Sequence, residues 1–191
     1  MSTIAPSPRE WTPDDILAMP GDVLYELVDG RLVELNVSVG SSFIVGKIAC
    51  LLMDDVASPR IAHVFPLHGY ICFPGKPYRM RRPDISLILA DRMTPELFKE
   101  DFTSIRPDLA VEVVSPNDLV LDLEDKLDDY RDAGIPLVWV VYPPTRRVRV
   151  FRPGMPPTDL TGDDELTGEA ILPGFRCRVA DLFAGLPEAS D

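Results

Sequence analysis

Residues 107–143, PDLAVEVVSPNDLVLDLEDKLDDYRDAGIPLVWVVYP, decide the fold class. The stretch opens with a nearly continuous apolar strand at 108–114 and closes with a second one at 137–141. The residues between them have the spacing of an amphipathic helix. A strand, a helix and a strand in this order form a βαβ unit, so we expect the two strands to be parallel and joined by a right-handed crossover.

The helix of this unit is predicted to begin at a cap on Asn117 or Asp118 and to run to about residue 133. Gly134 favours its end, and Pro136 prevents its continuation. Its apolar face is expected from side chains spaced at helical intervals, namely Leu119, Leu123, Leu127 and Tyr130.

Turn and cap residues predict further elements on both sides of this unit. They are a short helix from Thr12 to about residue 20, a hairpin turning at Asp29 and Gly30, a helix at 40–56 capped by Ser41 or Ser42, strands at 63–66, 70–73 and 83–89, a short helix at 93–100, an edge strand at 146–151 and a last helix at 179–183. This pattern predicts an α/β fold of the α+β type, with a central mixed sheet flanked by helices. We expect residues 1–10 to form a flexible N-terminal arm and residues 11–191 to form a single domain.

The composition is that of a globular protein, with 191 residues of which 46% are hydrophobic and 26% are charged. No stretch is long and apolar enough to cross a membrane, and the first residues lack the pattern of a secretory signal. We therefore expect a cytoplasmic protein without a membrane partner. The three cysteines form no CxxC pair, which favours buried, reduced thiols over a zinc site.

The formal net charge of −12 argues against a nucleic-acid partner, because phosphate contacts require Lys and Arg. Net charge does not describe the surface distribution, however, and the arginines are clustered. Two interpretations are open: each cluster is a local basic patch, or each is a solvated face of a strand. One cluster consists of Arg79, Arg81 and Arg82, and the other of Arg146, Arg147, Arg149 and Arg152.

Two acids lie in strands that otherwise have the pattern of buried strands. Asp84 begins PDISLIL, and Glu112 lies inside PDLAVEVV. A buried carboxylate is costly unless it has a cation, a basic partner or hydrogen bonds. Mg²⁺ prefers carboxylate oxygens, so the two residues are candidate metal ligands. The alternative is that each acid pairs with an arginine, such as Arg82 or Arg106.

A third acid, Glu26, lies in the apolar stripe that Leu24 and Val28 form in the predicted hairpin. It is a candidate for a further metal ligand, directly or through water. The alternative is a partner for Arg31 or for another basic residue. The two histidines of the chain are too few for a histidine-based metal centre and are expected to be structural.

These stretches carry a resemblance. Pro83-Asp84 followed by Glu112-Val113-Val114 resembles the metal-binding half of a PD-(D/E)XK nuclease. More specifically, the chain resembles the Uma family of putative restriction endonucleases through YELVDGRLVEL, RRPDISLILADR, residues 107–143 and LTGEAILPGF, which together extend over nearly the whole chain. The resemblance implies a restriction-endonuclease-like core. It also implies phosphodiester hydrolysis that depends on Mg²⁺, with Mn²⁺ as a substitute, and a homodimer that acts on nucleic acid, above all DNA.

The resemblance also implies site residues. The metal would be held by Asp84, Glu112, the backbone carbonyl of Val113, and Glu26. The chain departs from the superfamily pattern at Val114, which stands where a lysine is expected.

Lys126 is the natural substitute for that lysine, in a D-x-x-x-K-x-x-x-Y pattern formed with Asp122 and Tyr130. It would orient or deprotonate the attacking water and offset charge on the phosphate. The alternative is an ordinary surface lysine in contact with Asp122 and Asp129.

Two functions therefore compete. The first is a Mg²⁺-dependent endonuclease with Asp84, Glu112, Glu26 and Lys126 as catalytic residues. The second is a catalytically weak or inactive nucleic-acid-binding or regulatory protein on the same fold, which the acidity of the chain and Val114 favour. An unrelated small-molecule enzyme would need a pocket that the sequence does not indicate.

Overall fold

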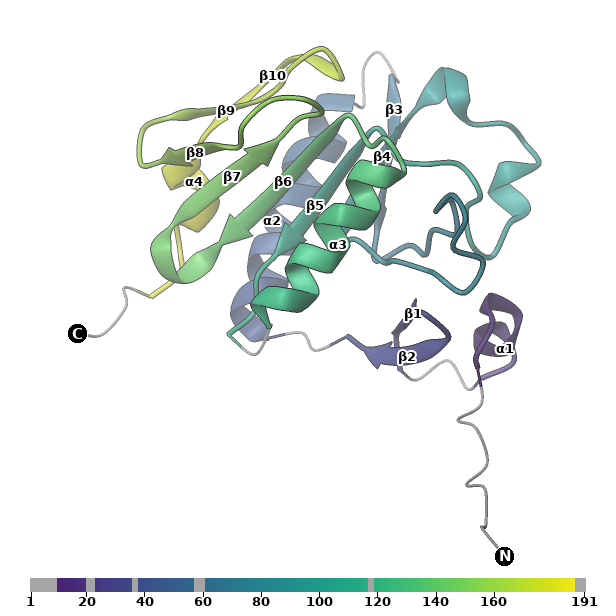
Figure 1. Cartoon of the computed structure of the whole chain (residues 1–191). Helices are drawn as coiled ribbons and strands as arrows, with labels where there is room; N and C mark the ends of the chain where they lie inside the picture. The colour runs from purple at the N-terminus through teal and green to yellow at the C-terminus, as the bar shows by residue number, and fades with distance from the viewer. Residues whose placement is uncertain (1–9, 20–22, 36–37, 57–60, 117–118, 188–191) are drawn as a thin grey trace, which may run out of the picture.

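The computed structural model describes residues 10–19, 23–35, 38–56, 61–116 and 119–187. Its centre is a six-stranded sheet in the order β3-β4-β5-β6-β7-β8 (Figure 1). β5 and β6 are parallel, and the other neighbours are antiparallel, so the predicted mixed sheet is confirmed. The strands are β3 (Ala62–Pro66), β4 (Ile85–Leu89), β5 (Leu109–Val113), β6 (Leu137–Tyr142), β7 (Arg147–Phe151) and β8 (Thr158–Thr161).

Helices cover both faces of this sheet (Figure 1). α3 (Val120–Asp132) lies over β5 and β6 on one face, while α2 (Val39–Val56) and α4 (Val179–Phe183) lie on the other. A two-stranded sheet of β9 (Glu165–Gly168) and β10 (Leu172–Arg178) packs on the α2 side.

The side chains of β5 alternate between two apolar layers. Val111 belongs to the core on the α2 side, and Ala110 to the core on the α3 side. Because side chains two residues apart in a strand share a face, Glu112 points with Ala110 toward α3. The layers of the fold therefore bring this acid beneath the helix that carries Lys126.

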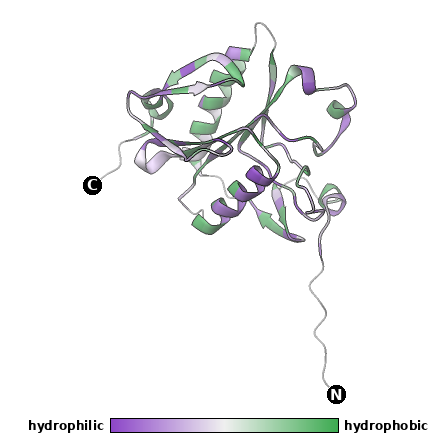
Figure 2. Cartoon of the chain, turned by 45° about the horizontal axis from the view of Figure 1, so that its top comes forward, coloured by the Kyte–Doolittle hydropathy of each residue, from purple (hydrophilic) through white to green (hydrophobic). Residues whose placement is uncertain are grey.

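The βαβ unit forms as the sequence predicts, with Leu109 paired to Leu137 in parallel register. Gly134 ends α3 with a left-handed φ of 72°, which glycine adopts without strain. The predicted caps at 117 and 118 lie outside the described residues, and Leu119 is the N-cap, with no side-chain hydrogen bond. Leu119 is 65% exposed, so its assignment to the apolar face is wrong. Figure 2 shows this hydrophobic first turn at the end of a mostly hydrophilic helix.

The predicted N-terminal elements are confirmed. Thr12 caps α1 (Pro13–Leu17) and exchanges hydrogen bonds with Asp15. Strands β1 (Tyr25–Val28) and β2 (Arg31–Glu34) form a hairpin whose turn residues, Asp29 and Gly30, both have positive φ, as a type I′ turn requires.

Four local predictions are corrected. α2 begins at Val39 and its first turn is capped by Ser38, which accepts the N–H of Ser41, so Ser41 and Ser42 are not the cap. Predicted strand 70–73 is reduced to isolated bridges at Tyr70. Predicted helix 93–100 is replaced by two 3-10 turns, η1 (Ala90–Arg92) and η2 (Leu97–Lys99). β7 is not an edge strand, because β8 pairs with its outer side.

The described helices include none that is both long and apolar enough to span a membrane. Apart from Glu10, the predicted N-terminal arm lies outside the described residues. All three cysteines are free thiols, but Cys50 is exposed and the other two are half-buried. The prediction that all three are buried is therefore wrong.

Gly168 lies at the β9–β10 turn, where a side chain would not fit. A Cβ there would lie 2.4 Å from the Cβ and 2.8 Å from the carbonyl oxygen of Leu172. Gly168→Ala should therefore lower the free energy of unfolding by about 1–3 kcal/mol. Gly46, in the middle of α2, has open space around it, so the control Gly46→Ala should raise that free energy by about 1 kcal/mol. Urea denaturation would measure both; equal midpoints would contradict this packing.

Candidate active site

Asp84 immediately precedes β4, and Glu112 lies near the end of β5. Ile85 pairs with Val111 in the antiparallel register, so continuing this register by one residue brings Asp84 beside Glu112. The N–H of Val113 donates to Oδ2 of Asp84 at 2.6 Å. Glu112 is buried and Asp84 is half-buried. The fold thus brings the two predicted carboxylates to one edge of the sheet.

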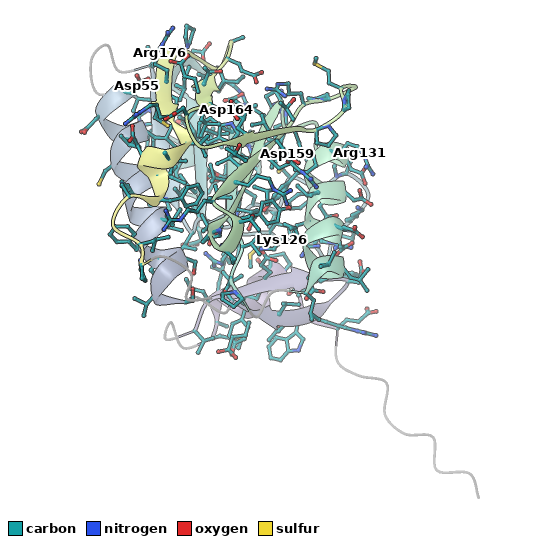
Figure 3. All side chains as sticks on the ribbon, turned by 90° about the vertical axis from the view of Figure 1, so that its left-hand side faces the viewer. Asp55, Lys126, Arg131, Asp159, Asp164 and Arg176 are labelled. Atoms are coloured by element: carbon teal, nitrogen blue, oxygen red, sulfur yellow. The ribbon has the colours of Figure 1, made fainter. Side chains whose placement is uncertain are left out.

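Two side chains of α3 contact Glu112. Nζ of Lys126 lies 3.2 Å from Oε2, and the hydroxyl of Tyr130 donates a hydrogen bond to Oε1. Lys126 and Tyr130 share a helix face because they are four residues apart. Lys126 therefore points from α3 toward the sheet (Figure 3), and its ion pairs are with Glu112 and Glu26 rather than with neighbouring helix acids.

Glu26 is brought to the same place by the β1–β2 hairpin. Its carboxylate is fully buried and accepts from three donors. Oε1 accepts from the backbone N–H of Arg82 at 2.9 Å and lies 3.1 Å from Nζ of Lys126, while Oε2 accepts from Arg81 at 3.0 Å. The basic partners of Glu26 are thus Arg81 and Lys126, and not Arg31.

The charged groups of the site shift the pKa values of Glu112 and Lys126. Burial raises the pKa of the Glu112 carboxyl; Lys126 opposes this rise, and Asp84 and Glu26 reinforce it. Burial alone would lower the pKa of the Lys126 ammonium, but Glu112, Glu26 and Asp84 outweigh it and raise the pKa. Lys126 is therefore protonated at neutral pH and offsets part of the negative charge around Glu112.

These residues line one cavity of about 200 Å³ between the hairpin, α3 and the end of the sheet. Acids outnumber bases in its wall. The acids are Glu26, Glu34, Asp84, Glu112, Asp122 and Asp125, and the bases are Arg81 and Lys126; Val113, Val114, Leu119 and Leu123 are among the apolar residues. A cavity with this lining attracts cations and repels anions unless a cation is bound.

The donor set fits a hard divalent cation. Asp84, just before β4, and Glu112, on β5, offer carboxylate oxygens, and Val113 lines the same cavity. Mg²⁺ is usually held by one or two carboxylates, with water and substrate phosphate completing its shell. Within the described ranges, no three or more His, Cys, Asp or Glu side chains are grouped so that they could hold a metal ion. The two carboxylates therefore fit a site in which water and a ligand complete the shell of the cation.

Of the two arginine clusters, the one with Arg79 and Arg81 does not form the basic patch considered from the sequence. Arg79 and Arg81 are buried and bind acids of α3. On β7, Arg147 and Arg149 both pair with Asp159. Each of these four arginines therefore pairs with an acid of the protein.

Sequence reasoning missed the roles of Tyr130 and Arg81. Tyr130 was expected on the apolar face of the helix and in the pattern around Lys126, without a role of its own, but its hydroxyl binds Glu112. Its place four residues after Lys126 was the available signal. Arg81 was expected in a basic patch or on a solvated strand face and instead lies between Glu26 and Asp129, with no local pattern that indicates either partner.

Comparisons with known proteins give the family and the fold of the chain. A family model described as "Uma2: Putative restriction endonuclease" matches residues 13–180. The fold is similar to the crystal structure of a putative nuclease belonging to DUF820 from Anabaena variabilis ATCC 29413, with a TM-score of 0.77, 22% sequence identity, and coverage of 90% of this chain and 97% of that chain. At this identity the likeness shows the fold alone. No curated protein matches the chain. Because the family match extends over most of its length, the chain belongs to the Uma2 family of putative restriction endonucleases.

Proposed function

We propose that this protein is a Mg²⁺-dependent endonuclease that hydrolyses phosphodiester bonds in DNA, with Mn²⁺ as a substitute for Mg²⁺. The observation that carries the proposal is the pairing of Asp84 with Glu112 in one cavity, with the ammonium of Lys126 beside them. Two carboxylates and a cationic side chain are the groups that metal-assisted phosphodiester hydrolysis requires.

In this proposal, Asp84, Glu112 and the backbone carbonyl of Val113 hold the cation. When bound, a divalent cation lowers the pKa of a coordinated water and polarises the phosphate. Tyr130 keeps one oxygen of Glu112 oriented through its hydrogen bond. Lys126 orients the attacking water and stabilises the negative charge that develops on the phosphate.

The position of Lys126 offsets the missing strand lysine. Val114, two residues after Glu112, supplies an apolar side chain to the cavity wall. Lys126 approaches the same carboxylate from α3, at 3.2 Å. An ammonium delivered from a helix acts on the same water as one delivered from a strand if it reaches the same point, so Val114 does not by itself exclude hydrolysis.

The competing function is a nucleic-acid-binding or regulatory protein without turnover. Two observations favour it: the net charge of −12 and the acidic wall of the cavity. Both weaken the attraction for a polyanion when no cation is bound. The two functions therefore differ in whether metal supports cleavage or binding alone.

We further propose that the nuclease acts in the cytoplasm as a homodimer. The free thiols of Cys50, Cys72 and Cys177 suit a reducing compartment. Cleavage of both strands of a duplex needs two sites, and each chain supplies one candidate cavity of this kind. Light scattering on the purified protein would measure the mass, and a monomer at micromolar concentration would contradict the dimer.

Cleavage assays test the proposal directly. Supercoiled plasmid, single-stranded DNA and RNA would be incubated with Mg²⁺, with Mn²⁺ or with EDTA over a range of salt concentrations. We expect cleavage of DNA with either metal and none with EDTA. Binding without cleavage under every condition would favour the regulatory alternative.

Lys126→Met should reduce turnover by about 10²-fold or more while changing the Mg²⁺ concentration for half-maximal rate by less than about threefold. The fold should survive, because Glu26 keeps Arg81 as a partner and Glu112 keeps Tyr130. Lys99→Met is the matched control, since Lys99 is exposed in η2, away from the cavity. Unchanged turnover in Lys126→Met would remove the catalytic role of this lysine.

A further inference from the structure

Glu26 already has two cationic side chains and one backbone donor as partners. Its carboxylate is fully buried, and both oxygens accept hydrogen bonds. The donors come from two segments distant in sequence: the chain at Arg81 and Arg82, and α3 at Lys126. A metal ion bound to Glu26 would lie close to the guanidinium of Arg81 and the ammonium of Lys126, and both would repel it.

Arg81 binds Glu26 and links it to α3. Its guanidinium is buried and donates to Glu26, and it also binds Asp125 and Asp129 on α3. The backbone supports this contact, because Leu27 and Met80 exchange hydrogen bonds of 2.9 Å and so align Glu26 with Arg81. The hairpin, the chain before β4 and α3 are therefore joined at Glu26.

Lys126 lies almost midway between two carboxylates. Its Nζ is 3.1 Å from Oε1 of Glu26 and 3.2 Å from Oε2 of Glu112. A cation held by Glu112 would compete with Lys126 for Oε2. Without a second anchor, the ammonium would be repelled from the cavity; with Glu26 in place, it keeps a partner close to the cation.

We infer that Glu26, supported by Arg81, is a positioning residue that keeps the ammonium of Lys126 in the cavity when a cation occupies Glu112, and that it is not itself a metal ligand. The catalytic meaning of this inference rests on the proposed nuclease function. The two physical statements in it, that Glu26 restrains Lys126 and that Glu26 does not bind the cation, are independent of cleavage. They revise the expectation that Glu26 joins Asp84 and Glu112 in the metal shell.

NMR on the full chain labelled with ¹⁵N-lysine would measure how firmly Glu26 holds the ammonium of Lys126, through the exchange rate of its protons. The chain has only four lysines, Lys47, Lys76, Lys99 and Lys126, so the side-chain signals are few, and the Lys126→Met variant assigns the one of interest. We expect Lys126 to give a slowly exchanging ammonium signal with and without Mg²⁺. In Glu26→Gln its proton exchange should become at least about tenfold faster in the presence of Mg²⁺, because a neutral amide does not hold the ammonium. Lys76, which pairs with Asp129 and Asp132, is the internal control.

Metal binding is measured separately by titrating the full chain with Mn²⁺ in a calorimeter. We expect Glu26→Gln to change the Mn²⁺ affinity by less than about threefold and Asp84→Asn to lower it more than about tenfold. Glu26→Asp is the second variant, since it keeps the buried charge while withdrawing the oxygens from Lys126 by one methylene. It should also speed the exchange of Lys126 without weakening Mn²⁺ binding.

Two results would overturn the inference: a loss of Mn²⁺ affinity in Glu26→Gln as large as in Asp84→Asn, or an unchanged exchange rate of Lys126 in both Glu26 variants. If the wild type cleaves no nucleic acid, the nuclease proposal fails, and faster exchange with intact Mn²⁺ affinity still supports the positioning role. If it does cleave, Glu26→Gln should lower kcat while the Mg²⁺ dependence stays the same.

Discussion

Glu112→Gln should abolish metal-dependent cleavage, with a fall in kcat of about 10³-fold or more, and Asp84→Asn should do the same. Each replacement removes one of the two carboxylates that we propose as metal ligands, which line the same cavity. Mg²⁺ binds neutral amide oxygens much less strongly than carboxylates in such a site, so both metal affinity and turnover should fall. Plasmid cleavage with Mg²⁺ and with Mn²⁺ measures the loss.

The same substitutions should leave the protein folded. Burial, Asp84 and Glu26 all raise the pKa of Glu112, which means that ionising this carboxyl in the folded protein costs free energy. Neutralising it should keep the thermal midpoint the same or raise it, since Lys126 retains Glu26 as a partner. Glu124→Gln is the matched control on the exposed side of α3, outside this cavity, and should cleave at the wild-type rate. Cleavage by Glu112→Gln at a rate near that of the wild type would mean that the metal lies elsewhere.

Asp84 and Glu112 could be singled out from the sequence because their signal is local. Each acid interrupts an apolar run, and buried carboxylates require partners. The βαβ pattern of residues 107–143 also placed α3 over the strand that carries Glu112. The role of Lys126 came from the family resemblance, since the helix pattern left an ordinary surface lysine open. The sequence alone did not supply the register that brings Asp84 beside Glu112.

The buried ion network could not be predicted, because its partners are distant in sequence and no periodic pattern links them. Arg79 and Arg81 lie in a Pro- and Gly-containing stretch that has the composition of an exposed turn. In the fold this stretch passes beneath α3, where Arg79 binds Asp125 and both arginines bind Asp129. Asp129 itself is one of two adjacent aspartates on a charged helix, and only the packing distinguishes it from exposed Asp128.

The exposed residue Leu119 illustrates the opposite error. Its spacing from Leu123 predicts a shared apolar face, but Leu123 packs against the core while Leu119, at the N-cap, is exposed. Helical periodicity reports direction around the axis and not where along the axis the contact begins. The same limit applies to the edge-strand prediction for β7, because the outer neighbour, β8, follows a turn whose direction the strand pattern does not set.

Asp129→Ala should lower the free energy of unfolding by about 3–5 kcal/mol, the usual cost of removing one partner from a buried ion pair. The carboxylate is fully buried and accepts from Lys76 at 2.7 Å, from Arg79 at 3.0 Å and from Arg81 at 2.7 Å. Its loss leaves buried guanidinium groups with fewer acceptors and loosens α3 from the chain before β4.

The neighbouring aspartate provides the control for this last experiment. Asp128 is 58% exposed and pairs only along the helix, with Arg131, so Asp128→Ala should change the free energy of unfolding by less than about 0.5 kcal/mol. The two variants have the same composition and the same helix propensity change, and they differ only in which side of α3 loses a charge. Urea denaturation followed by circular dichroism measures both midpoints. If the midpoints fall equally, the network around Asp129 does not hold α3 in place. Arg81 would then be fixed beside Glu26 by its contacts with the hairpin and not by its contact with Asp129.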